Sequence, residues 1–186
     1  MLKGLDLKGA AQVALAGATV GTGMDAFHTF SGTTHYFHPL VLETAFWVPF
    51  LFATAYLLEA FTFAQLLPLD ARRAPRSQAL LCFAGFTAVY FATGFAPVSN
   101  AGKLAICVAA GIAGIAALRS KAALLTGLVA AIVGPGFEVF LTGIGGFEHL
   151  QPDFFRIPIW LPGLYFASGP GIGPLLSAWL KPEVTR

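Results

Sequence analysis

Basic residues are distributed unevenly between the loops that separate six long apolar segments of this chain. The segments cover residues 9–30, 40–67, 78–96, 104–118, 122–144 and 159–180. Each approaches the ~20 residues that a helix needs to cross a hydrocarbon core about 30 Å thick. The sequence therefore predicts an all-α integral membrane protein, built as one bundle of six transmembrane helices.

The charges also predict the orientation of this bundle. Lysines and arginines precede the first segment and follow the second, fourth and sixth, at Lys3, Lys8, Arg72, Arg73, Arg76, Arg119, Lys121, Lys181 and Arg186. Only Lys103 and Arg156 fall in the opposite set of loops. Because cytoplasmic loops carry the excess of Lys and Arg, both termini are predicted to be cytoplasmic. Cleavage of a signal peptide near Ala18 is disfavoured, since it would leave an uneven number of segments.

Composition supports a membrane protein and argues against a nucleic-acid partner. Hydrophobic residues make up 56% of the 186 residues and charged residues 11%, with a mean hydropathy of +0.74. These values leave too little polar surface to cover a soluble globule. The net charge of +2 is spread over short loops rather than gathered in a patch, so it indicates orientation rather than nucleic-acid binding.

Helix breakers interrupt several of the apolar segments, notably at Pro49, Pro162, 134–136 and 169–174. Proline frees a backbone carbonyl, which must then face protein or a cavity rather than lipid. The pattern is consistent with simple packing kinks and with helices that enclose a ligand cavity. Small-residue pairs would permit self-association into a homo-oligomer such as a trimer, at Gly17 with Gly21 and at Gly111 with Gly114.

Ionisable residues inside the apolar segments are the first candidates for a site, because a charge in the bilayer is costly. Asp25 and His28 share a face of the first helix, and Glu138 follows the breaker in the fifth. Glu59 stands apart, nearer the cytoplasmic side. An aromatic face in the third segment either packs against neighbouring helices or forms the wall of a lipid pocket. The candidate lipid-binding residues are Asp25, His28, Glu43, Trp47, Phe83, Phe86, Tyr90 and Glu138.

Two other functions remain open for these groups. Imidazole and carboxylate suit zinc or iron, so a metal-dependent membrane enzyme acting on lipids could use His28, His38 and Glu138. Their spacing matches no compact ligand motif, and the serines lack a GxSxG elbow, so neither a metal site nor a catalytic residue is predicted. A small transporter would instead place an intramembrane charge such as Glu138 on a water pathway.

Short motifs in the second and last segments resemble those of the insulin-induced gene (Insig) family. Residues 45–49 read AFWVP, similar to the family's WVP motif. Residues 151–156 and 160–169 read QPDFFR and WLPGLYFASG, similar to SPDF...WLP...FFAGG, and Arg119-Ser120 resembles the family's Arg-Ser. The resemblance covers about residues 37–180. Its signature residues are Trp47, Pro49, Arg119, Pro152, Asp153, Phe154, Trp160, Pro162 and Gly169.

The resemblance implies a six-helix endoplasmic reticulum protein that acts as a sensor and adaptor rather than an enzyme. Animal members bind oxysterols within the bilayer, retain Scap with its SREBP cargo and promote degradation of HMG-CoA reductase. Leu118 stands where those members carry the acidic residue needed to hold Scap, so a Scap-type partner is not expected. Short loops and an Ala/Gly-rich composition indicate a prokaryotic homologue, located in the inner membrane of a bacterial cell.

The sequence thus predicts a single Insig-like membrane domain over residues 1–186. We expect it to hold a diacylglycerol-like or sterol-like membrane lipid in a cavity among its helices, without a cofactor, and to act as a sensor or adaptor.

Overall fold

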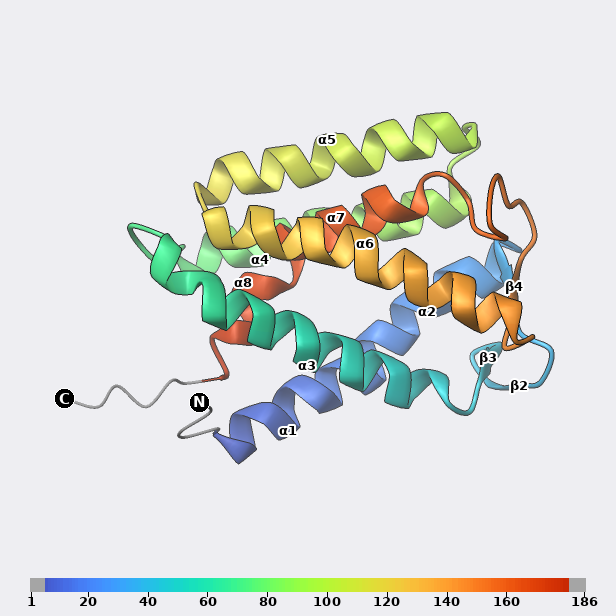
Figure 1. Ribbon diagram of the computed structural model, residues 1–186, viewed down its shortest axis with the longest axis horizontal. Helices are drawn as coiled ribbons and strands as arrows, with labels where there is room; N and C mark the ends of the chain where they lie inside the picture. Colours follow the sequence, from blue (N-terminus) through green and yellow to red (C-terminus); the bar gives the residue numbers. More distant parts are fainter. Residues whose placement is uncertain (1–5, 181–186) are drawn as a thin grey trace.

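The computed structural model describes residues 6–180, which form a bundle of helices with short strands gathered at one end (Figure 1). Lys3, Lys181 and Arg186, which contributed to the predicted orientation, lie outside these residues. Successive helices run in alternate directions along the long axis of the bundle. The beginning of α1 (Leu7–Ala16) and the end of α8 (Gly173–Ser177) lie at the end away from the strands.

The first predicted segment is a continuous rod of α1, the π-helical turn η1 (Gly17–Gly21) and α2 (Thr22–Phe30). Asp6 caps its beginning by accepting a hydrogen bond from the backbone N–H of Lys8 at 3.1 Å. The glycines of η1 lie against α3 (Val48–Leu66), where a Cβ on either would collide with Phe52. Glycine at these two positions therefore sets how closely the first rod approaches α3.

Four helices among residues 6–180 are long and apolar enough to cross a membrane. They are α3 with the short 3-10 turn η2 (Leu67–Leu69), α4 (Arg76–Phe95), α5 (Asn100–Leu118) and α6 (Lys121–Gly143). The last predicted segment is divided at Ile172 into α7 (Leu161–Gly171) and α8. The predicted boundaries of the third to fifth segments agree with α4, α5 and α6 to within a few residues.

The turn between α5 and α6 explains why Arg119 and Ser120 occur together. Arg119 adopts a left-handed conformation with φ +52°, which ends α5. Ser120 then caps α6 by accepting a hydrogen bond from the N–H of Ala123 at 2.9 Å. The carboxylate of Asp70, from the loop before α4, accepts hydrogen bonds from the N–H groups of Lys121 and Ala122 at 2.7 and 3.1 Å. The Arg-Ser pair therefore has a structural role in this chain.

Two small antiparallel sheets cover the other end of the bundle. Strand β1 (Thr34–His35) pairs with β4 (Glu148–His149), and β2 (Pro39–Val41) pairs with β3 (Thr44–Ala45). The predicted start of the second helix at residue 40 is therefore wrong. Leu42 and Glu43 have φ of 54° and 58°, which no helix accommodates, and α3 begins only at Val48 with Pro49 in its first turn.

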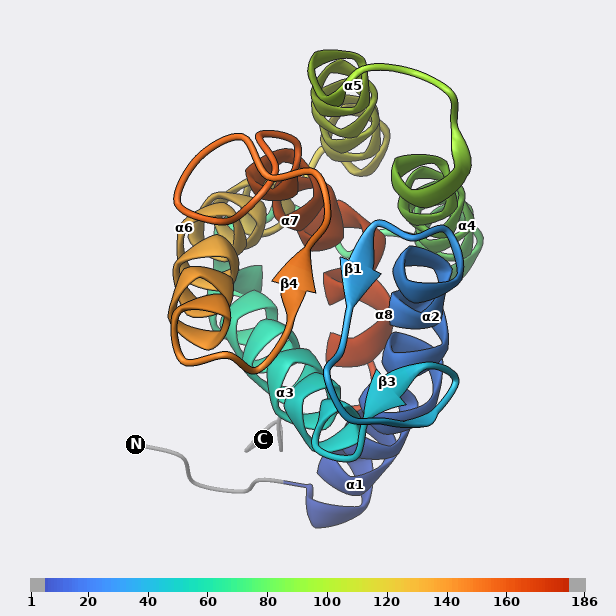
Figure 2. The ribbon, with the colours of Figure 1, turned by 90° about the vertical axis from the view of Figure 1, so that its right-hand side faces the viewer.

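Helix α7 lies in the interior of the bundle, packed against α4, α5 and α6 (Figure 2). Gly111 of α5 packs against the ring of Phe166, and Gly114 packs against Pro170. Gly169 lies directly on the backbone of α6. The glycine pairs proposed for self-association thus pack inside the chain, so they are not the surface through which it would form a homo-oligomer.

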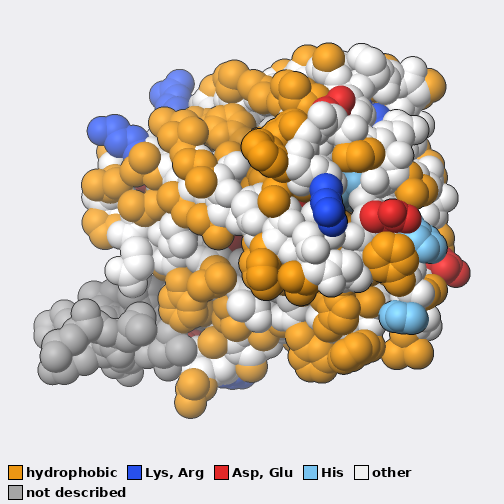
Figure 3. Space-filling view, turned by 45° about the vertical axis from the view of Figure 1, so that its right-hand side comes forward, with side chains coloured by type: hydrophobic (Ala, Val, Ile, Leu, Met, Phe, Trp, Pro, Cys, Tyr) orange, Lys and Arg blue, Asp and Glu red, His pale blue; other side chains and the backbone are white. Residues whose placement is uncertain are grey.

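The outer surface of the bundle is largely apolar along its sides. Large side chains such as Phe50, Leu81 and Ile132 are more than two-thirds exposed on α3, α4 and α6. Figure 3 shows hydrophobic side chains over most of one face, with acidic and histidine side chains toward the strand end and two groups of basic side chains at the opposite end. Together with the four long apolar helices, this surface identifies an integral membrane protein.

Candidate functional site

A cavity of about 330 Å³ lies inside the bundle, bounded by α2, α3, α4, α6 and α7 and covered at one end by β1 and β4. Its walls are mainly apolar and aromatic, with Met24, Phe52, Tyr56, Phe86 and Leu164 among the lining residues. Volume and lining are typical of a site for a small organic ligand. The helix breakers were consistent with packing kinks or with a ligand cavity, and the structure contains such a cavity.

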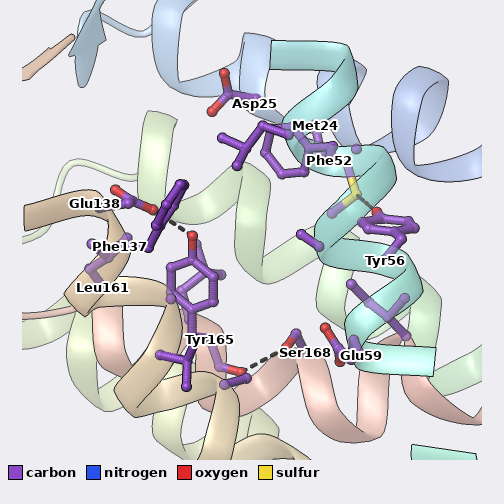
Figure 4. Close-up of a pocket in the computed structure, with 18 of the residues that line it drawn as sticks. Met24, Asp25, Phe52, Tyr56, Glu59, Phe137, Glu138, Leu161, Tyr165 and Ser168 are labelled. Carbon is purple, nitrogen blue, oxygen red and sulfur yellow. Dashed lines mark hydrogen bonds between the residues drawn. The ribbon is translucent and has the colours of Figure 1, made fainter. Parts of the chain in front are cut away.

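The breaker at residues 134–136 shapes one wall of this cavity. Helix α6 continues through Pro135, while Gly134 lies so close to the ring of Tyr165 that a Cβ there would collide with it. The ring can therefore lie flat against α6, and its hydroxyl donates a hydrogen bond to Oε1 of Glu138 at 2.7 Å. Glycine thus positions a tyrosine of α7 against a carboxylate one turn further along α6 (Figure 4).

Five side chains that line the strand end of the cavity form two separate hydrogen-bonded groups, which together we call the polar cluster: Asp25 with Tyr36, and Glu138 with His149 and Tyr165. The Tyr36 hydroxyl donates to Oδ2 of Asp25 at 2.8 Å, and Nε2 of His149 lies 2.8 Å from Oε2 of Glu138. Both carboxylates therefore have partners although the cluster is largely buried.

Tyr36 lies outside the long helices, in the loop after β1, and is almost fully buried. Burial raises the pKa of this phenol well above its ordinary value, and the neighbouring Asp25 acts in the same direction. Tyr36 therefore stays protonated and keeps its role as the donor to Asp25.

His28 lies on the same face of α2 as Asp25, as predicted, but its ring is held by other partners. Its Nε2 lies 2.8 Å from Oγ1 of Thr93, and the ring stacks on Tyr90 with a centroid distance of 4.5 Å. Trp160, which is almost completely buried, lies on another side at 5.3 Å between centroids. His28 thus joins α2, α4 and the start of α7 beside the cavity.

The structure brings some of the predicted lipid-binding residues together and leaves others apart. Asp25, His28, Phe86, Tyr90 and Glu138 all line the cavity. Glu43 is exposed in the turn between β2 and β3, because the helix predicted to carry it is not formed there. Trp47 packs on Tyr36 at the beginning of α3, and Phe83 is half-buried on α4, both outside the cavity lining.

Residues considered for a metal centre are not assembled into one. His38 is exposed beside β2, His28 is paired with Thr93, and Glu138 is occupied by His149 and Tyr165. Within residues 6–180, no group of three His, Cys, Asp or Glu side chains could hold a metal ion.

Several cavity residues were not identified from the sequence. Tyr36 and His149 fall between the predicted segments, and only the pairing of β1 with β4 brings those loops together. The sequence does not link Tyr165 to Gly134, because the two positions are far apart in the chain and meet only in the folded structure. Thr126 and Ser168 also line the cavity, and nothing in their sequence context distinguishes them from other small polar residues of membrane helices.

The family-signature residues mostly build the scaffold beside the cavity. Oδ2 of Asp153 accepts hydrogen bonds at 2.8 Å from the side chain of Asn100 and from the N–H of Ile159, which fixes the loop before α7. Pro49 and Pro162 occupy the first turns of α3 and α7. Phe154 is bridged to Ile157 in the same loop, which Pro152 opens.

An apolar helical bundle with an internal cavity and a buried polar cluster defines an integral membrane protein with a ligand-sized site. Its fold is that of a bacterial Insig homologue. The crystal structure of the mycobacterial Insig homolog MvINS from Mycobacterium vanbaalenii matches with a TM-score of 0.81 and 24% identity, over 98% of this chain and 100% of that chain. The crystal structure of a cross-linked MvINS trimer matches over the same shares, with a TM-score of 0.80 and 24% identity.

No family model matches the chain, and no curated protein sequence matches it. The fold nevertheless confirms the resemblance to a prokaryotic Insig-like protein that the short motifs indicated.

Proposed function

We propose that this protein is an Insig-type binding protein that holds one neutral amphiphilic lipid in its cavity, with the polar head at the polar cluster. The observation that carries the proposal is the side on which the cavity opens. At the strand end, the lining residues Thr34, Tyr36, Phe147 and His149 are all buried, so water has little access there. The ligand must therefore come from another side.

The opening faces the side of the bundle, between α3 and α6. Leu58 of α3 and Val129, Val133 and Phe137 of α6 line the cavity, yet each remains roughly half exposed on the apolar surface. The three α6 residues are spaced one turn apart and form a continuous apolar edge. Since this surface faces lipid in an integral membrane protein, a ligand reaches the cavity from the bilayer rather than from water.

The charges around the cavity favour a neutral or hydroxyl-bearing head over a phosphate. Asp25, Glu59 and Glu138 line it, whereas no Lys or Arg does so among residues 6–180. Carboxylates repel a phosphate but accept hydrogen bonds from hydroxyls. A diacylglycerol-like or sterol-like molecule fits these groups, while an anionic phospholipid does not.

The same proposal includes six membrane crossings within a single domain, with the rod α1–η1–α2 and the pair α7–α8 as the broken first and last crossings. The end of the bundle that carries Arg72, Arg73 and Lys121 would face the cytoplasm. The chain would lie in a bacterial inner membrane and form a homo-oligomer, as the cross-linked MvINS trimer suggests. It would act as a sensor or adaptor, and not as an enzyme.

Native mass spectrometry of protein purified in mild detergent, followed by lipid extraction, tests this function. We expect one neutral, hydroxyl-bearing lipid per chain, and amphiphiles of that class should raise the melting temperature of delipidated protein. Protein that retains no lipid and is stabilised by no amphiphile would contradict the proposal. The same spectra report the oligomeric state.

A further inference from the structure

Three polar side chains line the cavity away from the polar cluster, on three different helices: Glu59 of α3, Thr126 of α6 and Ser168 of α7. We call this group the inner polar site. Thr126 is 1% exposed, and its Oγ1 has no hydrogen-bond partner. Oε1 of Glu59 is also buried without a partner. Such atoms are rare in native proteins and require an explanation.

Close backbone packing brings these three side chains to one level of the bundle. Gly169 lies directly on the backbone of α6 at Ala123 and Gly127, so its neighbour Ser168 lies beside the turn of that helix that carries Thr126. Gly173 lies against Phe63, one turn beyond Glu59 on α3. Figure 4 shows Glu59 and Ser168 side by side, with the Ser168 hydroxyl donating a hydrogen bond to the backbone carbonyl of Tyr165 at 2.7 Å.

The hydroxyls of Thr126 and Thr22 lack the hydrogen bond that several other helical threonines of this chain make, and of these two only Thr126 lines the cavity. Thr19, Thr54 and Thr87 each donate a hydrogen bond to the carbonyl four residues earlier in their helix, at 2.7 to 3.0 Å. A threonine inside a helix usually satisfies its hydroxyl in this way. Thr126 makes no such bond, so its hydroxyl remains available to a group in the cavity.

The inner polar site lies well away from the polar cluster. Thr126 and Glu138 both line the cavity from α6 and are twelve residues apart in the sequence. At 1.5 Å per residue this corresponds to roughly 18 Å along the helix axis. A ligand that reaches both regions must carry two polar groups separated by a long apolar stretch.

We propose that Glu59 and Thr126, with Ser168 beside them, recognise a hydroxyl on the apolar tail of the bound amphiphile. The Thr126 hydroxyl donates to the ligand oxygen, and the ligand hydroxyl donates to Oε1 of Glu59. The protein then selects a lipid with a hydroxylated tail over the same lipid without that hydroxyl, because only the former satisfies both buried atoms. This selectivity rests on the proposed function, since it requires the cavity to hold a lipid.

Two monoglycerides provide the test. Monoricinoleoyl glycerol and monooleoyl glycerol have the same head and chain length and differ by one hydroxyl in the tail. Their affinities are measured on the delipidated full chain by competition in native mass spectrometry. We expect monoricinoleoyl glycerol to bind about tenfold more tightly, as a hydrogen bond to a charged or strongly polar group allows.

Three variants locate the source of this preference. Thr126→Val removes the proposed donor and Glu59→Leu removes the proposed acceptor, so each should bring the ratio of the two affinities close to one. Thr54→Val is the matched control, because Thr54 also lines the cavity but its hydroxyl is already bonded to the carbonyl of Phe50. That variant should keep the full preference.

The outcomes separate this inference from the proposed function. Equal binding of the two lipids, or a preference that survives in Thr126→Val and Glu59→Leu, overturns the inner polar site and leaves the function intact. If the two lipids bind equally and Thr126→Val melts at a higher temperature than the wild type, the inner site is filled by water and not by a ligand hydroxyl. Failure of both lipids to bind overturns the proposed function, and the inner site with it.

Discussion

The two polar regions of the cavity differ in how their side chains are satisfied. In the polar cluster, both oxygens of Glu138 are hydrogen-bonded to partners on β4 and α7, and Asp25 is bonded to Tyr36. In the inner polar site, one oxygen of Glu59 and the hydroxyl of Thr126 have no partner. Side chains that satisfy one another hold their own geometry, whereas unpartnered groups gain stability only when something binds. The first region therefore shapes the cavity, and the second is available for selection.

Glu138→Ala should have the largest effect on stability. It removes the shared partner of His149 and Tyr165 and leaves two buried polar groups unsatisfied, at a cost of about 2–4 kcal/mol. Thermal unfolding in detergent measures this loss. Glu148→Ala, which removes an exposed carboxylate from β4, is the control and should change little. Equal melting temperatures of the two variants would contradict a structural role for the polar cluster.

Val133→Trp tests whether the cavity is reached from the bilayer. A tryptophan at this position would obstruct the edge between α3 and α6, and we expect the affinity for the retained lipid to fall roughly tenfold, or about 1.4 kcal/mol. Ile132→Trp adds the same bulk one residue away, where the side chain is exposed and does not line the cavity. If both variants retain the same amount of lipid, the opening lies elsewhere.

Tyr36→Phe removes one donor from the polar cluster, and we expect a loss of about 1 kcal/mol near neutral pH. Because the pKa of Tyr36 is raised in the folded state, its contribution to stability is complete below about pH 10, the ordinary pKa of tyrosine, and is lost as the pH rises further. Unfolding curves of the wild type and the variant should therefore converge in alkaline solution. Parallel curves would show that Tyr36 titrates normally.

Glu59→Gln should have the smallest effect on the empty protein. Oε1 has no partner to lose, so the melting temperature should change by the equivalent of no more than about 0.5 kcal/mol in either direction. A loss as large as that of Glu138→Ala would remove the distinction between the two regions, because Glu59 would then be a structural carboxylate as well.

The length of the apolar segments and the charge of the loops predicted the helices well where a single apolar segment corresponds to a single helix. They failed at residues 40–47, because Leu40, Val41 and Leu42 are apolar in a strand as much as in a helix. Only the backbone conformation of Leu42 and Glu43 reveals the turn.

The candidate site was predictable only in part, for a related reason. Asp25, His28 and Glu138 are conspicuous because ionisable residues are rare in apolar segments. Their partners are ordinary loop or helix residues: Tyr165 lies 27 residues beyond Glu138, and the strand that carries His149 pairs with β1, which lies 115 residues earlier. Such long-range contacts leave no trace in local periodicity.

The pairing of β1 with β4 also has a consequence for how the protein is made. Thr34 and His149 are 115 residues apart, so the strand that closes the cavity above the first rod emerges only after α6 has been synthesised. Until then the strand end stays uncovered, and the central helix α7 has not yet arrived. The lipid that we propose as ligand would then be enclosed as the chain is completed, which would make its capture an event of biogenesis as well as of equilibrium binding.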